Sequence, residues 1–355
     1  MTLEELGGWP FVLGRLSSGH DLSAAEAGAA LSDVFEGNAT PSQLAAFIFG
    51  LRCKGETVEE MTGLARTMID AAELVPVDDT LRNRLVDTCG TGGDRSGTIN
   101  VSTIAAFVVA GAGVPVCKHG NRAATSKAGS ADLLESLGVA IDLGPSGVAA
   151  CIAQAGIGFC FAPRFHPSMR HAGPTRRELG VPTVFNFLGP LANPARARRQ
   201  VVGVSDPAMA DKMVGVLEAN GALHTLVVYG HDGLDELTTT DKSTIIEFRI
   251  DDDGERHLGS HQLDPVELGL PRVVKAELLG ADAATNADLA RRVLTGAKGP
   301  HRDIVLLNAA AGLMVAGQVA DLADGLVVAA SSVDDGQAAA CLDHLVQVSQ
   351  ALAHP

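Results

Sequence analysis

The middle of this chain alternates short apolar runs with helix-like segments, a pattern that only a few layered folds accommodate. Strands are expected at five short apolar runs: 85–87, 114–118, 158–161, 200–204 and 223–229. Helices are expected between them, near 102–112, 130–137, 146–154 and 207–220. Strand–helix alternation is typical of parallel strands joined by helical crossovers. The sequence therefore predicts an α/β fold with a mostly parallel central sheet flanked by helices.

The first 75 residues lack this alternation and indicate helices alone. Three residue pairs have the spacing of a capping box, in which two side chains cap one helix start: Ser23 with Glu26, Thr40 with Gln43, and Thr57 with Glu60. The helices that they open are expected over 24–36, 41–54 and 58–72. We therefore expect a small all-helical domain over 1–75, with helices from about 165–182 packed on it, and a large α/β domain over 76–355. Short helices bury little surface, so the small domain should pack against the rest of the chain or a second subunit.

Charge and cysteine pattern exclude several classes of protein. A net charge of −15 argues against a nucleic-acid partner, because such binding needs clustered Lys and Arg. The six cysteines are dispersed without a CxxC pair, so we expect most to be reduced and buried. The long uncharged run 143–163 contains Pro145 and four glycines, which favours a buried helix and strand over a membrane span. No signal peptide is evident, and a cytoplasmic protein without a membrane partner is expected.

Two glycine-rich loops follow predicted strands and precede predicted helices. The first is Asp87-Thr88-Cys89-Gly90-Thr91-Gly92-Gly93-Asp94, which continues through Thr98 to the hydroxyl-bearing run Asn100-Val101-Ser102-Thr103. The second is Lys118-His119-Gly120-Asn121-Arg122, which continues to Ser130, the expected cap of the next helix. Free N–H groups at a helix start attract anions, and glycine lets the backbone approach them. A tight turn with an N-cap is the alternative for either loop alone, whereas two such loops predict a polyphosphate site.

An acidic pair, Asp235-Glu236, follows the last predicted strand. Adjacent side chains on a strand point to opposite faces, so the pair can share a metal only if the chain turns there. Gly233 favours such a turn. Mg²⁺ is typically held by one or two carboxylates together with substrate phosphates. In isolation the pair would be a solvated acidic loop, but beside two phosphate-binding loops it indicates a magnesium site.

Five motifs together closely resemble the anthranilate phosphoribosyltransferases over nearly the whole chain. Besides the two loops they are Gly129-Ser130-Ala131-Asp132, Phe185-Asn186-Phe187-Leu188-Gly189-Pro190-Leu191-Ala192-Asn193-Pro194 and Gly233-Leu234-Asp235-Glu236. The resemblance implies a fold of the nucleoside phosphorylase and phosphoribosyltransferase type. It also implies a homodimer joined through the helical domain. Ala124-Thr125 and Ala128 depart from the family pattern, which bears on affinity rather than on activity.

The resemblance also assigns roles to individual residues. The implied ligands of 5-phosphoribosyl 1-pyrophosphate (PRPP) are Gly90, Gly93, Asp94, Thr98, Asn100, Val101, Ser102, Thr103, Lys118, His119, Gly120, Asn121, Arg122, Ala123, Ala124, Thr125, Ser126 and Ser130. The implied contacts of anthranilate are Gly90, Asn121, Arg176, His166 and Met169, with Pro167 in the apolar wall. The implied ligands of Mg²⁺, of which two ions are expected, are Ser102, Asp235 and Glu236. A guanidinium at Arg176 suits the substrate carboxylate.

The implied reaction is attack of the anthranilate amine on the ribose anomeric carbon, with loss of pyrophosphate. An aromatic amine is already a nucleophile, so no catalytic base is expected beyond substrate positioning and metal. Two alternatives are less favoured. A pyrimidine nucleoside phosphorylase would carry a Lys-His-Ser-Thr-Gly-Gly loop, which is missing from this chain. A catalytically silent nucleic-acid-binding relative would be expected to lose the acidic pair or Arg176 and to gain basic surface.

Overall fold

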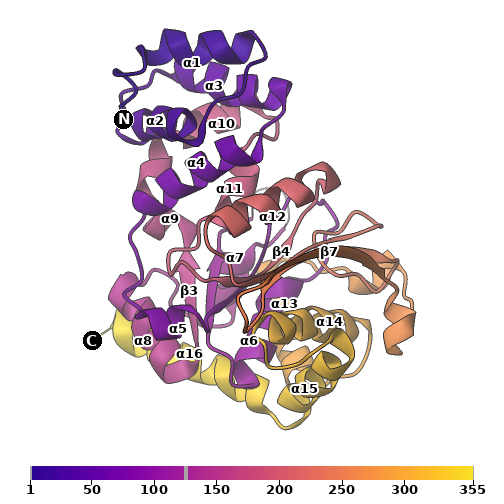
Figure 1. The fold of residues 1–355 in the computed structure, drawn as a ribbon. Coiled ribbons are helices and arrows are strands. Elements are labelled where there is room, and N and C mark those ends of the chain that lie inside the picture. The colour runs from indigo at the N-terminus through magenta and orange to yellow at the C-terminus, as the bar shows by residue number, and fades with distance from the viewer. Residues whose placement is uncertain (1, 124–126, 355) are drawn as a thin grey trace.

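The computed structural model describes residues 2–123 and 127–354, which form a helical domain standing on a larger α/β domain (Figure 1). The sheet order is β3 (Ile157–Phe161), β2 (Val116–Gly120), β1 (Val86–Gly90), β4 (Arg199–Gly203), β5 (His224–Gly230), β6 (Ser243–Ile250) and β7 (Arg256–Leu263). The first five of these pair in parallel, and β6 and β7 are antiparallel. The five expected strands and the mostly parallel sheet are confirmed.

The far edge of the sheet contains more structure than expected. Both β6 and β7 lie outside the strands that the sequence predicted. In the β5–β6 pair Gly230 lies opposite Ser243, so residues 231–242 form the connection between two hydrogen-bonded strands. That connection carries the acidic pair, and both of its ends are therefore fixed by the sheet.

Helices cover both faces of the sheet. The expected helices are present as α6 (Val101–Gly111), α7 (Ser130–Ser136), α8 (Pro145–Ala155), η2 (Pro207–Met209) and α12 (Ala210–Ala219). Four C-terminal helices were not anticipated: α13 (Ala283–Leu294), α14 (Pro300–Val315), α15 (Leu322–Asp334) and α16 (Gln337–Ala353). Shorter elements are α5 (Asp79–Arg82), α9 (Ala162–Phe165), α11 (Phe185–Leu191), η3 (Pro265–Leu268) and η4 (Lys275–Leu278). In Figure 1, α13 to α16 lie on the side of the sheet away from the helical domain.

Alternating side chains of the strands feed two separate apolar cores. On β5, Val228 belongs to the core shared with α6 and α14, and its neighbour Val227 belongs to the core shared with α12. The second core continues into the helical domain through α4, which packs on α12. The helical domain is therefore joined to one sheet face by a continuous apolar interior, and its own short helices need not bury their surface alone.

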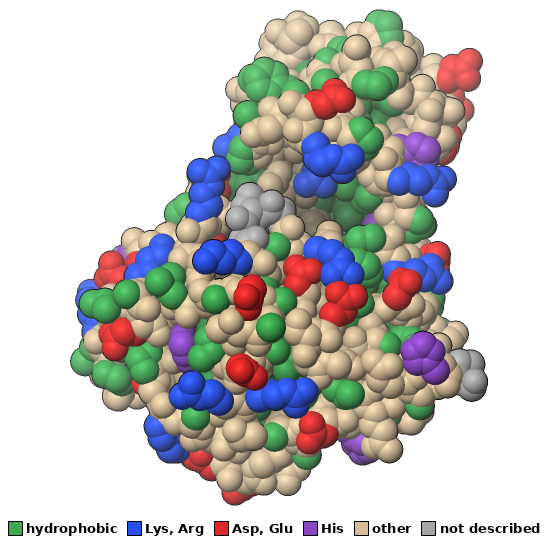
Figure 2. Space-filling view, turned by 180° about the vertical axis from the view of Figure 1, so that it is seen from behind, with side chains coloured by type: hydrophobic (Ala, Val, Ile, Leu, Met, Phe, Trp, Pro, Cys, Tyr) green, Lys and Arg blue, Asp and Glu red, His purple; other side chains and the backbone are tan. Residues whose placement is uncertain are grey.

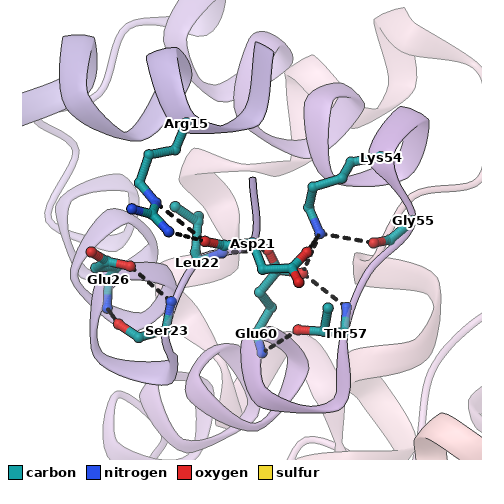
Figure 3. Close-up of polar contacts among 9 residues, drawn as sticks. All are labelled: Arg15, Asp21, Leu22, Ser23, Glu26, Lys54, Gly55, Thr57 and Glu60. Carbon is teal, nitrogen blue, oxygen red and sulfur yellow. Dashed lines mark hydrogen bonds and ion pairs between the residues drawn. The ribbon is translucent and has the colours of Figure 1, made fainter. Parts of the chain in front are cut away.

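The helical domain consists of α1 (Gly8–Ser17), α2 (Ala24–Phe35), α3 (Pro41–Lys54) and α4 (Val58–Asp70), with η1 (Pro167–His171) and α10 (Gly173–Leu179) packed on α2 and α3 respectively. All three predicted capping boxes are confirmed. Figure 3 shows how the buried Glu60 ties the domain together. Its carboxylate accepts from the Leu22 amide at 2.9 Å and from Lys54 Nζ at 3.0 Å. One charge on α4 thus fixes both the entry to α2 and the end of α3.

Five of the six cysteines are buried and all six are thiols, as expected; Cys53 alone is exposed. The predicted helix and strand within 143–163 correspond to α8 and β3. Among the described residues, no helix combines the length and apolar character needed to cross a bilayer.

One local expectation was wrong. Ser130 does not cap α7, because the N-cap position belongs to Gly129 and Ser130 is the first helical residue. The capping is done by Asp132, whose carboxylate accepts from the amides of Gly129 at 2.8 Å and Ala123 at 3.1 Å. A carboxylate at the third helical position is close to these amides and favours the positive end of the helix dipole.

Candidate active site

Four parallel strands end in glycine at one edge of the sheet: Gly90, Gly120, Gly203 and Gly230. At two of them the acidic loop lies against the backbone. A Cβ on Gly90 would lie 2.5 Å from Asp235 Oδ2, and one on Gly203 would lie 1.6 Å from the Asp235 carbonyl oxygen. The missing side chains therefore let residues 231–242 settle directly on the ends of β1 and β4, beside the first glycine loop.

The two carboxylates of this loop bind the first glycine loop through its amides. Asp235 Oδ2 accepts from the Gly92 N–H at 2.7 Å, and Glu236 Oε1 accepts from the Ser102 N–H at 3.1 Å. Ser102 is the second residue of α6, so Glu236 occupies the positive end of that helix. The turn predicted at Gly233 is present, with φ of +91°. The structure thus brings the predicted phosphate loop and the predicted metal ligands together.

The pKa values of Asp235 and Glu236 are raised well above those of ordinary carboxyl groups. Burial, followed by the neighbouring charge of Asp94, raises the pKa of Asp235 to about 7. Burial and the charge of Asp235 raise the pKa of Glu236 to about 8. Without a cation, Asp235 and Glu236 hold their protons to higher pH than ordinary carboxyl groups, which is typical of acids crowded at a cation site. Asp94, expected only as a PRPP ligand, is thus also part of the acidic cluster.

Lys118 forms the floor of the site. The side chain is buried; its Nζ donates to the Thr88 carbonyl oxygen and lies 3.4 Å from Ser102 Oγ. Its charge lowers the otherwise raised pKa of Glu236. The positive group therefore lies beneath both the start of α6 and the acidic pair, where a diphosphate would need it.

Arg122, at the end of the second loop, is held by acids of α7. Its guanidinium lies 2.8 Å from Asp132 Oδ1 and 2.9 Å from Glu135 Oε1, and it also covers the ring of Phe161. These contacts raise its pKa, with Glu135 contributing most. In this structure the arginine is fully engaged within its own segment, so a phosphate would have to compete for it. The predicted ligands Ala124, Thr125 and Ser126 lie outside the described residues.

The other predicted PRPP ligands line the same strand ends or fix their neighbours. Asn100 Nδ2 donates to the Ala128 carbonyl oxygen at 3.0 Å, which joins the first loop to the second. Ser130 Oγ donates to the Asn121 carbonyl oxygen at 3.1 Å. Thr98 Oγ1 lies 3.1 Å from the hydroxyl of Ser96. Gly93 adopts a positive φ of +84°, and Val101 and Thr103 are buried in the first turn of α6.

A second group of predicted residues forms a wall of neutral rings. The imidazoles of His119 and His166 lie 5.0 Å apart. Burial lowers the pKa of His119 to about 3 and that of His166 to about 4, so both rings are uncharged at neutral pH. His119 Nδ1 lies 3.1 Å from the carbonyl oxygen of Gly189. Met169, on η1, is partly buried against the core of the helical domain.

Arg176 is a cation without an acidic partner. The residue lies half-buried on α10, its guanidinium covers the ring of Phe185 at 5.1 Å, and burial lowers its pKa. No acidic side chain within the described residues lies at ion-pair distance from it. Phe185 and Gly189 belong to the same helix, α11, so the arginine and the imidazole wall are fixed by one element. Such a partly desolvated guanidinium suits an anionic ligand.

The sequence singled out the motif at 185–194 without explaining it, and the structure supplies the reason. Phe185 underlies Arg176 and Gly189 fixes His119. Asn193 Nδ2 donates to Asp87 Oδ2 at 2.8 Å and to the Cys117 carbonyl oxygen at 2.9 Å, which locks β1 to β2. Figure 2 shows a hollow at the waist of the molecule, between the two domains, with Lys and Arg side chains around it.

Comparison with known proteins identifies this architecture. Residues 82–339 match the α/β domain of a glycosyl transferase family, and residues 11–72 match the helical bundle domain of the same family. The chain belongs to this glycosyl transferase family.

More specifically, it belongs with the anthranilate phosphoribosyltransferases. It is 51% identical to that enzyme of Rhodococcus jostii over 97% of this chain and 94% of the relative. The solved anthranilate phosphoribosyltransferase of Thermus thermophilus superposes with a TM-score of 0.88 at 41% identity, covering 96% of this chain and 99% of the other. That of Saccharomyces cerevisiae, in complex with PRPP and Mg, superposes with a TM-score of 0.85 at 28% identity, covering 97% and 98%.

Proposed function

We propose that this protein is an anthranilate phosphoribosyltransferase of tryptophan biosynthesis. It transfers the phosphoribosyl group of PRPP to the amino group of anthranilate, giving N-(5-phosphoribosyl)anthranilate and pyrophosphate. The observation that supports anthranilate as the acceptor substrate is Arg176, a half-buried guanidinium without an acidic partner among the described residues. It would bind the anthranilate carboxylate, while the neutral imidazoles of His119 and His166 would flank the aromatic ring.

The donor fits the opposite side of the site. The Lys118 ammonium would donate to a diphosphate. The Gly92 and Ser102 amides would do the same once the diphosphate displaces the Asp235 and Glu236 carboxylates, which accept from them in this structure. Ser102, Asp235 and Glu236 are hard oxygen ligands at the same place, which suits Mg²⁺. Among the described residues no three His, Cys, Asp or Glu side chains are arranged to hold a metal by themselves. Substrate phosphates would therefore complete the coordination.

Catalysis would rest on position and charge. When bound, Mg²⁺ would neutralise the developing charge of the pyrophosphate leaving group. Lys118 adds a fixed positive charge under the same group, and the start of α6 adds its dipole. Because both imidazoles stay neutral, they would orient the ring and exclude water rather than remove a proton. The C–N bond forms as the C–O bond to pyrophosphate breaks, and the nitrogen then gives its proton to the released pyrophosphate.

Three finer features belong to the same proposal. Ser102, Asp235 and Glu236 would hold two Mg²⁺ ions, which would neutralise negative charge on the pyrophosphate. Two subunits would join through the helical domain, where Phe49 and Val181 are 48% and 45% exposed. The protein would work in the cytoplasm, where the highly charged PRPP is confined. Light scattering of the purified protein tests the dimer, because a monomeric mass would contradict it.

A fluorescence assay tests the reaction. Anthranilate is fluorescent and its ribosylated product much less so, and a decay that needs the protein, PRPP and Mg²⁺ together is expected. Retained binding of PRPP without decay would point to another aromatic acceptor. Phosphorolysis of a pyrimidine nucleoside by inorganic phosphate would instead favour the phosphorylase alternative, and a shift of labelled nucleic acid would favour the silent relative.

A further inference from the structure

Asn308 lies far from the acidic pair in sequence but holds the loop that carries it. The residue sits in the middle of α14, is 3% exposed, and is 71 residues from Leu237. Its Oδ1 accepts from the Leu237 N–H at 3.0 Å, and its Nδ2 donates to the Leu237 carbonyl oxygen at 2.8 Å. Leu237 directly follows Glu236. The Asn308 side chain therefore fixes both the N–H and the carbonyl oxygen of the residue next to the acidic pair.

The orientation of the Asn308 carboxamide is itself fixed by a third hydrogen bond. Its second N–H is donated to the Ile304 carbonyl oxygen, one turn earlier in α14, at 2.9 Å. The amide is therefore oriented by its own helix before it meets the loop. Replacing it would leave a buried N–H and a buried C=O of Leu237 without partners, and such groups are costly.

The helix that carries Asn308 is also coupled to the phosphate side of the site. α14 packs closely on α6: a Cβ on Gly312 would lie 2.7 Å from Val109. The first turn of α6 supplies Ser102, whose amide binds Glu236. The α6–α14 pair therefore sets the position of Ser102 through α6 and of Glu236 through Asn308.

The other side of the loop is closed by Asp232. Its Oδ2 accepts from the hydroxyls of Thr238, at 2.9 Å, and Thr240, while its Oδ1 accepts from the Leu234 amide at 3.2 Å. These bonds shape the loop internally. Two further bonds tie it to β6, from the Thr238 N–H to Ser243 Oγ and between His231 Nε2 and Thr244 Oγ1, both at 2.9 Å, whereas Asn308 ties it to α14. The two contributions can be separated by mutation.

We infer that Asn308 is a positioning residue for the metal-binding carboxylates, acting through the Leu237 backbone. Mg²⁺ accepts little deviation from octahedral geometry at ligand distances of about 2.1 Å, so a loop that drifts would bind it poorly. The inference rests on the proposed magnesium role of Asp235 and Glu236. Residues that orient metal ligands typically contribute about 10- to 100-fold to metal affinity.

Binding of Mn²⁺ in the presence of inorganic pyrophosphate, followed by electron paramagnetic resonance, tests the inference without turnover. In N308A the dissociation constant of Mn²⁺ should rise at least about tenfold. The KM for anthranilate should stay close to that of the unmodified protein, because the proposed acceptor residues His119, His166 and Arg176 lie on β2, after α9 and on α10 rather than on α14 or in the acidic loop. The matched control is S332A, which removes another buried side-chain bond of similar length, from Ser332 Oγ to the Val108 carbonyl oxygen at 2.8 Å, on the far side of α6.

The outcomes separate the inference from the proposed function. Equal Mn²⁺ affinity in N308A and S332A, both measured well below their melting temperatures, would overturn the positioning role alone. Absence of Mn²⁺ binding in the unmodified protein would overturn the metal assignment and the inference with it. Should N308A not fold, N308L replaces it, because leucine keeps the branched shape of the side chain but makes neither bond to Leu237. A weakened Mn²⁺ affinity would support the positioning role, and unchanged affinity would refute it.

Discussion

Gly203 offers the sharpest test of how the acidic loop is seated. This residue ends β4, and a Cβ there would lie 1.6 Å from the Asp235 carbonyl oxygen and 2.5 Å from the carbonyl carbon. Ordinary contacts of a Cβ begin at 3.4 Å, so Gly203→Ala must push the Asp235 backbone away by about 1.8 Å. Both atoms are backbone, and no flexible side chain can move aside instead.

A displacement of this size should disable the metal site more than the fold. Overpacking of this kind typically costs about 1–3 kcal/mol of unfolding free energy, which a chain of this size tolerates. A misplacement of about 1 Å at a catalytic group is enough for a loss of about 100-fold in rate. We therefore expect Gly203→Ala to fold, with a lower melting temperature, and to lose about 100-fold or more of its Mg²⁺-dependent turnover.

The control is another strand glycine in the same sheet. Gly259 lies on β7, and a Cβ there would meet no atom within 4 Å. Both variants should be assayed for anthranilate consumption across a Mg²⁺ titration and for thermal unfolding. If Gly203→Ala turned over as fast as Gly259→Ala at every Mg²⁺ concentration, the close approach of the loop would have no part in metal binding.

Three further perturbations follow from the same geometry. Arg176→Ala should raise the KM for anthranilate by about 10- to 100-fold, since a charge-assisted hydrogen bond contributes about 1.5–3 kcal/mol; the exposed neighbour variant Arg177→Ala should not, and equal effects would contradict the assignment. At about pH 9, above the pKa of about 7 for Asp235, Asp235→Asn should bind metal-free pyrophosphate more tightly than Asp94→Asn does. Both variants replace a carboxyl group by a neutral amide, but only the first weakens the acceptor on the Gly92 amide; equal affinities by calorimetry would reduce the effect to charge alone. In chelator-treated protein the folded state binds more protons than the unfolded chain, because the folded pKa values of Asp235 and Glu236 are raised. The free energy of unfolding should therefore fall as pH rises through about 7 to about 8, and saturating Mg²⁺ should remove this fall; a melting temperature that stays level with pH in this range, measured against Asp235→Asn, would refute it.

Local chemistry explains why much of the fold could be predicted from sequence. The capping boxes at Ser23, Thr40 and Thr57 close over three residues, so their partners are visible in any short window. The strand–helix alternation is also a local signal, because burial gives the apolar residues of each segment the spacing of a strand or of a helix. The same short range explains the error at Ser130, where a serine at a helix start suggested a cap. The neighbouring Asp132 reaches the amides of both Gly129 and Ala123.

The sequence by itself determined three helices of the small domain, though not α1, together with the parallel strands and the residue types gathered in the two loops and the acidic pair. Only the tertiary structure decided how these parts meet. The bond from Gly92 to Asp235 spans 143 residues and the bond from Leu237 to Asn308 spans 71. Contacts of that range depend on where the sheet, α6 and α14 place the backbone, and no local pattern encodes them. Only the packed chain places the Asp235 backbone against Gly203 and Leu237 against Asn308. It likewise places the Arg176 guanidinium over the Phe185 ring, with no acidic partner among the described residues.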